Sequence, residues 1–145
     1  MPSVKQILTH KGTDVITIAP TASVLDAALL MNEHRIGALV VVENSRVAGI
    51  ISERDMLWRV IAQRRDSADC PVDDVMTREV ICCRIETPMH EARAILMHRR
   101  IRHLPVVNDE GGLEGMISIG DLNAWELHGQ EQQIHFLHEY LYGRT

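Results

Sequence analysis

The stretch Gly49-Ile50-Ile51-Ser52-Glu53-Arg54-Asp55 recurs in the same chain as Gly115-Met116-Ile117-Ser118-Ile119-Gly120-Asp121. In both copies an apolar run precedes the glycine and a helix-like stretch follows the aspartate. The similarity continues upstream, where residues 35–42 resemble residues 100–107. An internal repeat of this size is typical of two copies of one supersecondary unit that bury a shared core.

Each copy is predicted to fold in the order β-α-β-β-α, which places the chain in the mixed α/β (α+β) class. Short β-branched runs predict the strands, and Ser23 and Ser52 are expected to cap the helices that follow them. The predicted elements are a strand at 14–18, a helix at 23–35, strands at 38–43 and 46–51 and a helix from Ser52, then a strand at 79–85, a helix at 88–100, strands at 103–107 and 113–118 and a helix near Asp121.

Four segments are expected along the chain: a first repeat at 1–64, a linker at 65–71, a second repeat at 72–123 and a tail at 124–145. A single half of about 60 residues would bury too little surface to be comfortably stable, so the two halves are predicted to pack face to face. In the tail, Ile134, Leu137 and Leu141 recur at helical spacing. They predict a C-terminal amphipathic helix that covers either the chain's own core or the same helix of a second subunit.

The composition argues against several classes of protein. The net charge of −5 is the wrong sign for nucleic-acid binding, which needs a basic surface. The longest apolar run, residues 38–42, is far shorter than the about 20 residues that cross a bilayer. The three cysteines are odd in number and form no C-x-x-C spacing, as is typical of a reducing compartment. We therefore expect a cytoplasmic protein that binds neither nucleic acid nor membranes.

The repeated Ser-x-x-Asp of residues 52–55 and 118–121 has two interpretations. It is the pattern of a helix N-cap, in which the serine accepts hydrogen bonds from exposed backbone N–H groups. The recurring glycine three residues earlier indicates that backbone approaches something closely there. A helix N-terminus also attracts anions, and a carboxylate mounted on it can accept two hydrogen bonds from the cis-diol of a ribose. The two roles can coexist, because a capped turn is a rigid support for a ligand-binding carboxylate.

As a set, the motifs of this chain resemble those of the cystathionine-β-synthase (CBS) domain. They are Val72-Asp73-Asp74-Val75-Met76-Thr77 with its counterpart at Val4 to Thr9, the Arg-Ile-x-x-Leu-x-Val-Val strand and the Gly-to-Asp motif, each present twice in the same order. The resemblance covers residues 4–123 and implies a CBS pair, a module that binds adenine nucleotides in regulatory proteins. It also implies that the repeats face each other around a pseudo-twofold axis and leave two clefts between their sheets.

The resemblance implies a set of ligand-binding residues for each cleft. In the first, Asp121 would bind the ribose with Ser118 beside it, Arg102 and His103 would face the phosphate, and Thr13, Ile16 and Ile36 would line the base and sugar. In the second, Ser52 and Asp55 would face Thr77, Ile81 and Ile101. Because the first repeat has Gly37-Ala38 where the second has Arg102-His103, the Asp121 cleft is predicted to be the nucleotide site and the Asp55 cleft the weaker one. Arg102 can also be read as a solvated residue at a helix end, and His103 as a half-buried structural histidine.

The function expected from this resemblance is regulatory binding without catalysis. The ligand would be AMP, ADP or ATP, with NADH and S-adenosylmethionine as further candidates, and the signal would pass to an unknown effector protein or through a homodimer formed by the CBS helices and the C-terminal helix. The alternative is a structural dimerisation subunit without a physiological nucleotide. An enzyme is not expected, because nothing pairs a nucleophile with a base. No cofactor or metal is expected either, since His128, His135 and His138 lack a suitably spaced thiol or carboxylate.

Overall fold

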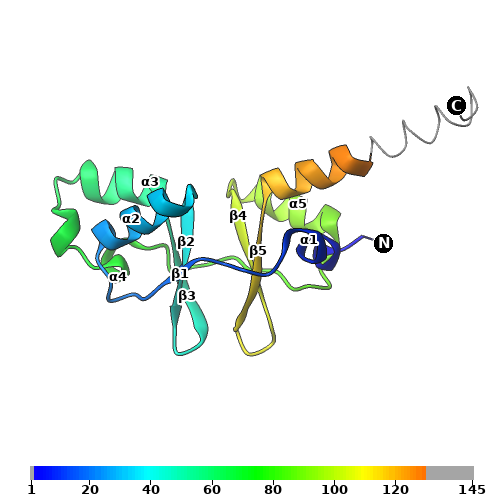
Figure 1. Cartoon of the computed structure of the whole chain (residues 1–145), viewed down its shortest axis with the longest axis horizontal. Helices are drawn as coiled ribbons and strands as arrows, with labels where there is room; N and C mark the ends of the chain where they lie inside the picture. Colours follow the sequence, from blue (N-terminus) through cyan, green and yellow to red (C-terminus); the bar gives the residue numbers. More distant parts are fainter. Residues whose placement is uncertain (1, 130–145) are drawn as a thin grey trace, which may run out of the picture.

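The computed structural model describes residues 2–129, which form two halves lying side by side, each a β-hairpin with helices packed against it (Figure 1). The first half holds β1 (Thr17–Ile18), α2 (Val24–His34), β2 (Ala38–Glu43), β3 (Arg46–Ser52), α3 (Glu53–Met56), a π-helical turn (Leu57–Ile61), a 3-10 turn (Ser67–Asp69) and α4 (Val72–Val75). The second half holds α1 (Val4–Lys11), α5 (Met89–His98), β4 (His103–Val107), β5 (Leu113–Ser118) and the helical residues 119–129.

The helix starts follow the capping chemistry expected from the sequence. Ser23 accepts a hydrogen bond from the backbone N–H of Asp26 at 3.0 Å, and Ser52 accepts one from Asp55 at 3.3 Å. Ser118 accepts from the N–H of Asp121 at 3.1 Å in the same way. The prediction of helices after these serines is therefore confirmed. Of the predicted tail helix, residues 124–129 are helical, and its apolar stripe lies outside the described residues.

The two hairpins are antiparallel, and β1 adds to β2 in parallel. The strands predicted at 14–18 and 79–85 were too long. The first is reduced to β1, and the second to a single parallel bridge between Cys83 and Val106. The reason is that the second segment crosses between the halves. The chain pairs with β3 at Thr77, just before this segment, and reaches β4 at Cys83, so the segment cannot follow either sheet for its whole length.

The two cores exchange their leading helices. Helix α1 packs in the second half, where the N–H of Val4 donates to the carbonyl of Thr87 at 2.9 Å, and α4 packs in the first half, where Val72 donates to Ala22 at 2.8 Å. The core of the second half includes Val4, Ile7, Leu8, Leu96, Leu104 and Ile117, and that of the first includes Val24, Met31, Leu39, Ile51, Val72 and Val75. This exchange ties the halves together, and Figure 1 shows the chain running from α1 across the molecule to β1.

Each repeated glycine lies against a leading helix that was exchanged between the cores, or against the residues that directly follow it. A Cβ on Gly49 would lie 2.6 Å from the Sδ of Met76 and 2.9 Å from the backbone oxygen of Thr77. A Cβ on Gly115 would lie 2.8 Å from a methyl carbon of Leu8. The close approach predicted from the motif is therefore present. It is made by the chain itself, at the edge of each Ser-x-x-Asp turn.

Candidate functional site

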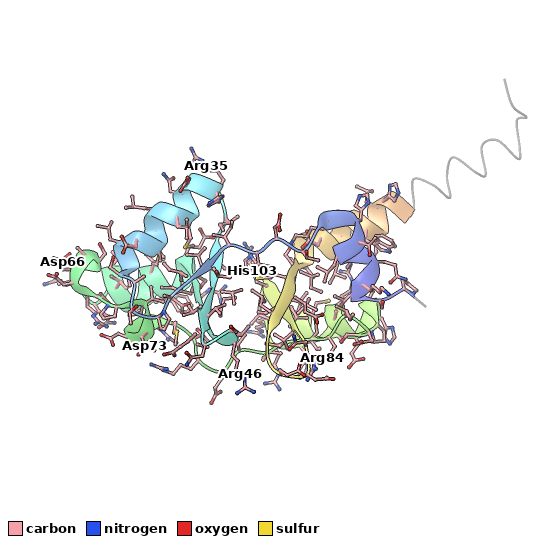
Figure 2. The ribbon with its side chains drawn as sticks, turned by 60° about the horizontal axis from the view of Figure 1, so that its bottom comes forward. Arg35, Arg46, Asp66, Asp73, Arg84 and His103 are labelled. Carbon is pink, nitrogen blue, oxygen red and sulfur yellow. The ribbon has the colours of Figure 1, made fainter. Side chains whose placement is uncertain are left out.

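A cavity of about 240 Å³ lies between the two halves, beside the first Ser-x-x-Asp turn. The first half contributes Ser52, Glu53 and Asp55 to its lining. The crossing segment contributes Thr77 and Ile81, and the second half contributes Ile101, Arg102 and His103. Figure 2 shows the labelled His103 at the junction of the two halves. A molecule bound there would contact both repeats at once.

Asp55 is the charged group most deeply placed in this cavity, with only 8% of its surface exposed. Its Oδ2 accepts hydrogen bonds from the backbone N–H of Ser52 at 3.0 Å and from the Ser52 hydroxyl at 3.1 Å. Its Oδ1 accepts one from the hydroxyl of Thr77 at 3.3 Å, and the Nε of Arg59 lies 3.8 Å away. These donors compensate for burial of the charge and hold the carboxylate at the cavity wall. The Thr77 hydroxyl can rotate, which frees one oxygen for a ligand donor.

Cationic and apolar groups complete the lining. Arg100 and Arg102 flank Ile101 along the edge of the cavity, next to His103. Ile50 and Ile81 supply apolar surface on the other walls. A buried carboxylate, an apolar slot and the guanidinium groups of Arg54, Arg100 and Arg102 in one cavity suit a ligand that carries hydroxyls, a flat apolar part and an anion.

The second Ser-x-x-Asp turn has different surroundings. The Oδ2 of Asp121 accepts from the N–H of Ser118 at 2.8 Å and from the Nζ of Lys11 at 2.7 Å. The adjoining cavity, of about 140 Å³, is lined by Ile7, His10, Lys11, Asp121, Ala124, Trp125 and His128. The rings of His10 and His128 stack there with centroids 6.0 Å apart. Asp121 is thus paired with a lysine of the chain itself.

Comparison with known proteins agrees with this architecture. The model of the CBS domain family matches residues 4–62 and 72–127. The chain belongs to the CBS domain family. The mitochondrial CBS domain-containing protein CBSX3 of Arabidopsis thaliana is 40% identical over 126 residues, and the match covers 83% of this chain and 61% of that protein.

Solved structures of CBS proteins have the same fold. The CBS-domain containing protein ATU1752 of Agrobacterium tumefaciens is 36% identical, with a TM-score of 0.80 over 86% of this chain and 99% of that one. The CBS domain protein PAE2072 of Pyrobaculum aerophilum, solved in complex with AMP, is 29% identical, with a TM-score of 0.74 over 83% of this chain and 89% of that one. The prediction of a CBS pair, with two repeats of mixed helices and strands, is therefore confirmed.

This CBS pair brings together only part of the residue set predicted for the Asp121 cleft. His103 pairs with Ser118 across the hairpin and is close enough to Asp121 for its pKa to be affected, but Arg102 and His103 also line the cavity of Asp55. Thr13 lies in a separate hollow beside α1, Ile36 in another beside α2, and Ile16 packs on the first core. The physical reason is the position of α1, whose residues Ile7, His10 and Lys11 lie beside Asp121. The set predicted for the other cleft does share one cavity: Ser52, Asp55, Thr77, Ile81 and Ile101.

Sequence reasoning missed several residues of these sites. Arg100, Glu53 and Glu79 line the Asp55 cavity but were not among the predicted site residues. Lys11 was overlooked altogether. The sequence holds a signal for Lys11. Between the start of the leading helix and the first strand, the first copy has three residues more than the second copy.

Among residues 2–129, no helix is long and apolar enough to span a bilayer, and no three histidine, cysteine or acidic side chains are grouped to hold a metal ion.

The imidazole of His103 makes the stability of this CBS pair depend on pH. Burial lowers the pKa of His103 below 6.5, Lys11 and Arg102 lower it further, and Asp121 and Glu53 act in the opposite direction. The folded protein therefore binds fewer protons at His103 than the unfolded chain does. It follows that the stability is fully present above pH 6.5 and is lost as the pH falls toward the lowered value.

We expect His103→Gln to remove this part of the pH dependence. Between about pH 7.5 and 5.5, the free energy of unfolding should fall more for the wild type than for the variant, as urea titrations at each pH would measure. The difference between the two proteins isolates His103 from the other histidines. Parallel curves for the two proteins would contradict the prediction.

Proposed function

We propose that this CBS pair is a regulatory module without catalysis that binds an adenine nucleotide in the Asp55 cavity. The observation that carries the proposal is the placement of Asp55 opposite Arg102 and His103 across one cavity between the repeats. Asp55 would accept hydrogen bonds from the ribose hydroxyls. The apolar surfaces of Ile50, Ile81 and Ile101 would hold the base and sugar, and Arg102 and His103 would bind the phosphate. The AMP complex of the Pyrobaculum relative supports this choice of ligand class.

The proposed mechanism is thermodynamic linkage. A ligand that contacts Asp55 of one repeat and Arg102 of the other would favour the packing in which both are in reach. A partner protein or a second copy of the chain that binds one packing better than the other would then respond to the ligand. AMP, ADP and ATP are the first candidates, and NADH and S-adenosylmethionine share the adenosine group.

The alternative is a structural dimerisation subunit whose cavity takes no physiological nucleotide. One observation favours self-association: large apolar side chains stand exposed on the helices of the first half, with Leu29 58%, Trp58 60% and Ile61 67% exposed. Met97 and Leu127 are similarly exposed in the second half. Apolar groups gathered on helix faces favour contact with another protein surface. A homodimer through these helices is compatible with both functions.

A thermal-shift series with AMP, ADP, ATP, adenosine, NADH and S-adenosylmethionine tests the proposal. A bound ligand at about a hundred times its dissociation constant stabilises the folded state by about 2.7 kcal/mol. For a chain of this size the midpoint should rise by about 2–4 °C per kcal/mol. If none of the six ligands shifts the midpoint, the structural alternative is favoured.

Arg102→Ala should separate phosphate binding from nucleoside binding. Loss of one charge-assisted hydrogen bond, about 1.5–3 kcal/mol, should weaken AMP binding about 10- to 100-fold. Adenosine binding should stay unchanged, because adenosine has no phosphate. Arg99→Ala is the matched control, since Arg99 is a neighbouring arginine outside the cavity lining. Equal losses for AMP and adenosine in calorimetric titrations would contradict the assignment of Arg102 to the phosphate.

A further inference from the structure

The side chain of Lys11 is bound both to the second Ser-x-x-Asp turn and to the strand β5 that leads into it. Its Nζ donates to the Oδ2 of Asp121 at 2.7 Å and to the carbonyl of Met116 at 2.8 Å. The same carboxylate oxygen also accepts the N–H of Ser118 at 2.8 Å. Oδ2 of Asp121 therefore has two donors, as Oδ2 of Asp55 has, but at Asp121 one of them is a cation.

The first turn has Thr77 in the equivalent place. The N–H of Thr77 donates to the carbonyl of Ile50 at 2.8 Å, and its hydroxyl donates to Asp55 at 3.3 Å. Ile50 and Asp55 are the counterparts of Met116 and Asp121 in the repeated motif. The single side chain of Lys11 thus makes both contacts that Thr77 makes on the other side of the molecule. A neutral hydroxyl can give way to a neutral ligand hydroxyl, but an ammonium held by a charge-assisted bond is much harder to displace.

The cause of this asymmetry lies in the local sequence. From Val4 to Ile18 the first copy has three residues more than the second copy has from Val72 to Cys83. Three residues are nearly one helical turn, and α1 runs for eight residues where α4 runs for four. The longer helix brings Lys11 to the end of β5, and Gly12 ends it there with a φ of 102°. In the second copy the chain leaves the helix at Met76, and Thr77 pairs with β3 instead.

The residue at the position of Lys11 in the second copy is Glu79. Glu79 lines the Asp55 cavity, where a carboxylate cannot neutralise Asp55 or compete for its oxygens. Each Asp has one cation beside it, but the Nε of Arg59 lies 3.8 Å from Asp55, whereas the Nζ of Lys11 is hydrogen-bonded to Asp121 at 2.7 Å. The carboxylate of Asp55 is therefore left accessible to a ligand, whereas the carboxylate of Asp121 is bound by Lys11 of the same chain.

We propose that Lys11 is a built-in plug of the Asp121 cleft, so that the wild-type chain binds one adenine nucleoside or nucleotide and loss of the Lys11 ammonium opens a second site. The identity of the ligand rests on the proposed function. The residues that line the Asp121 cavity include no arginine, so the opened site should take an uncharged nucleoside. Adenosine is accordingly the probe.

Calorimetric titration with adenosine tests the plug through its stoichiometry. We expect one site in the wild type, two sites in Lys11→Ala and one site in the double variant Lys11→Ala/Asp121→Ala. Lys5→Ala is the matched control, an exposed lysine of the same helix, and should keep one site. Lys11→Gln removes the charge but keeps much of the side-chain length, so it provides a second opened variant if the alanine variant melts early.

The outcomes separate the plug from the proposed function. One site in both Lys11 variants would overturn the plug, and so would two sites in the wild type of which Asp121→Ala removes one. If neither the wild type nor the Lys11 variants bind adenosine, the plug is also overturned. If the wild type binds none but Lys11→Ala binds one that is lost on Asp121→Ala, the plug stands and the assignment of the Asp55 cavity fails.

Discussion

Asp55→Asn is expected to weaken AMP binding by about 100-fold or more, because two hydrogen bonds from the ribose to a charged acceptor contribute about 1.5–3 kcal/mol each. Asparagine has nearly the same shape, so the capping contacts to Ser52 should largely persist and the fold should be kept. The measurement is calorimetric titration with AMP, with circular dichroism to confirm folding. The loss should extend to adenosine, since the ribose is common to both ligands.

Asp121→Asn is the control for this variant. Asp121 has the same place in the repeated motif, but its carboxylate is paired with Lys11. AMP affinity should therefore remain close to that of the wild type. The reverse result, a large loss at Asp121 and none at Asp55, would favour the Asp121 cleft predicted from the sequence and would contradict nucleotide binding in the Asp55 cavity.

Gly49→Ala is expected to destabilise the fold by about 1–3 kcal/mol, as overpacking of a tight interior site does. The new methyl group would lie 2.6 Å from the Sδ of Met76 and 2.9 Å from the backbone oxygen of Thr77. Met76 can move its sulfur, but the Thr77 oxygen belongs to the backbone that pairs with β3. Because Thr77 also lines the cavity, the variant should bind AMP less tightly as well.

Thermal unfolding measures this effect, with about 2–4 °C of midpoint expected per kcal/mol. Gly120→Ala is the matched control. A Cβ there would meet only the hydroxyl of Ser118, at an ordinary 3.5 Å, and the position is helical. Alanine should therefore stabilise that helix by about 0.5–1 kcal/mol. A midpoint for Gly49→Ala equal to that of the wild type would show that the contact between β3 and the crossing segment is loose.

Much of the local structure follows from short sequence signals. Ser23, Ser52 and Ser118 cap helices because their hydroxyls satisfy backbone N–H groups within three residues, and such contacts need no distant partner. The hairpins were predicted for the same reason, since their strands are neighbours in the chain. The strand at 79–85 was predicted wrongly because Val80, Ile81 and Ile85 are β-branched and apolar, yet within this range only Cys83 pairs with a strand.

The grouping of the site residues depended on contacts between the halves. Arg102 and His103 differ from Gly37-Ala38 of the first repeat, and pairing within the hairpin places His103 beside Ser118. Their position in the repeat does not say that they also line the cavity of Asp55. That is decided by the way the hairpins meet, with Arg46 of one hairpin bonded to Glu110 of the other at 2.8 Å. Such contacts join residues far apart in sequence, and no local pattern encodes them.

The sequence by itself determined the doubled unit, the family, the capped turns and the two aspartates, because each of these depends on the residue types within a few positions. Tertiary structure alone decided the exchange of α1 and α4 between the cores and the joining of Arg102 with Asp55. It also decided the pairing of Lys11 with Asp121. The physical reason is that the two Asp turns are nearly alike as sequences, while their surroundings are set by a helix one turn longer on one side than on the other.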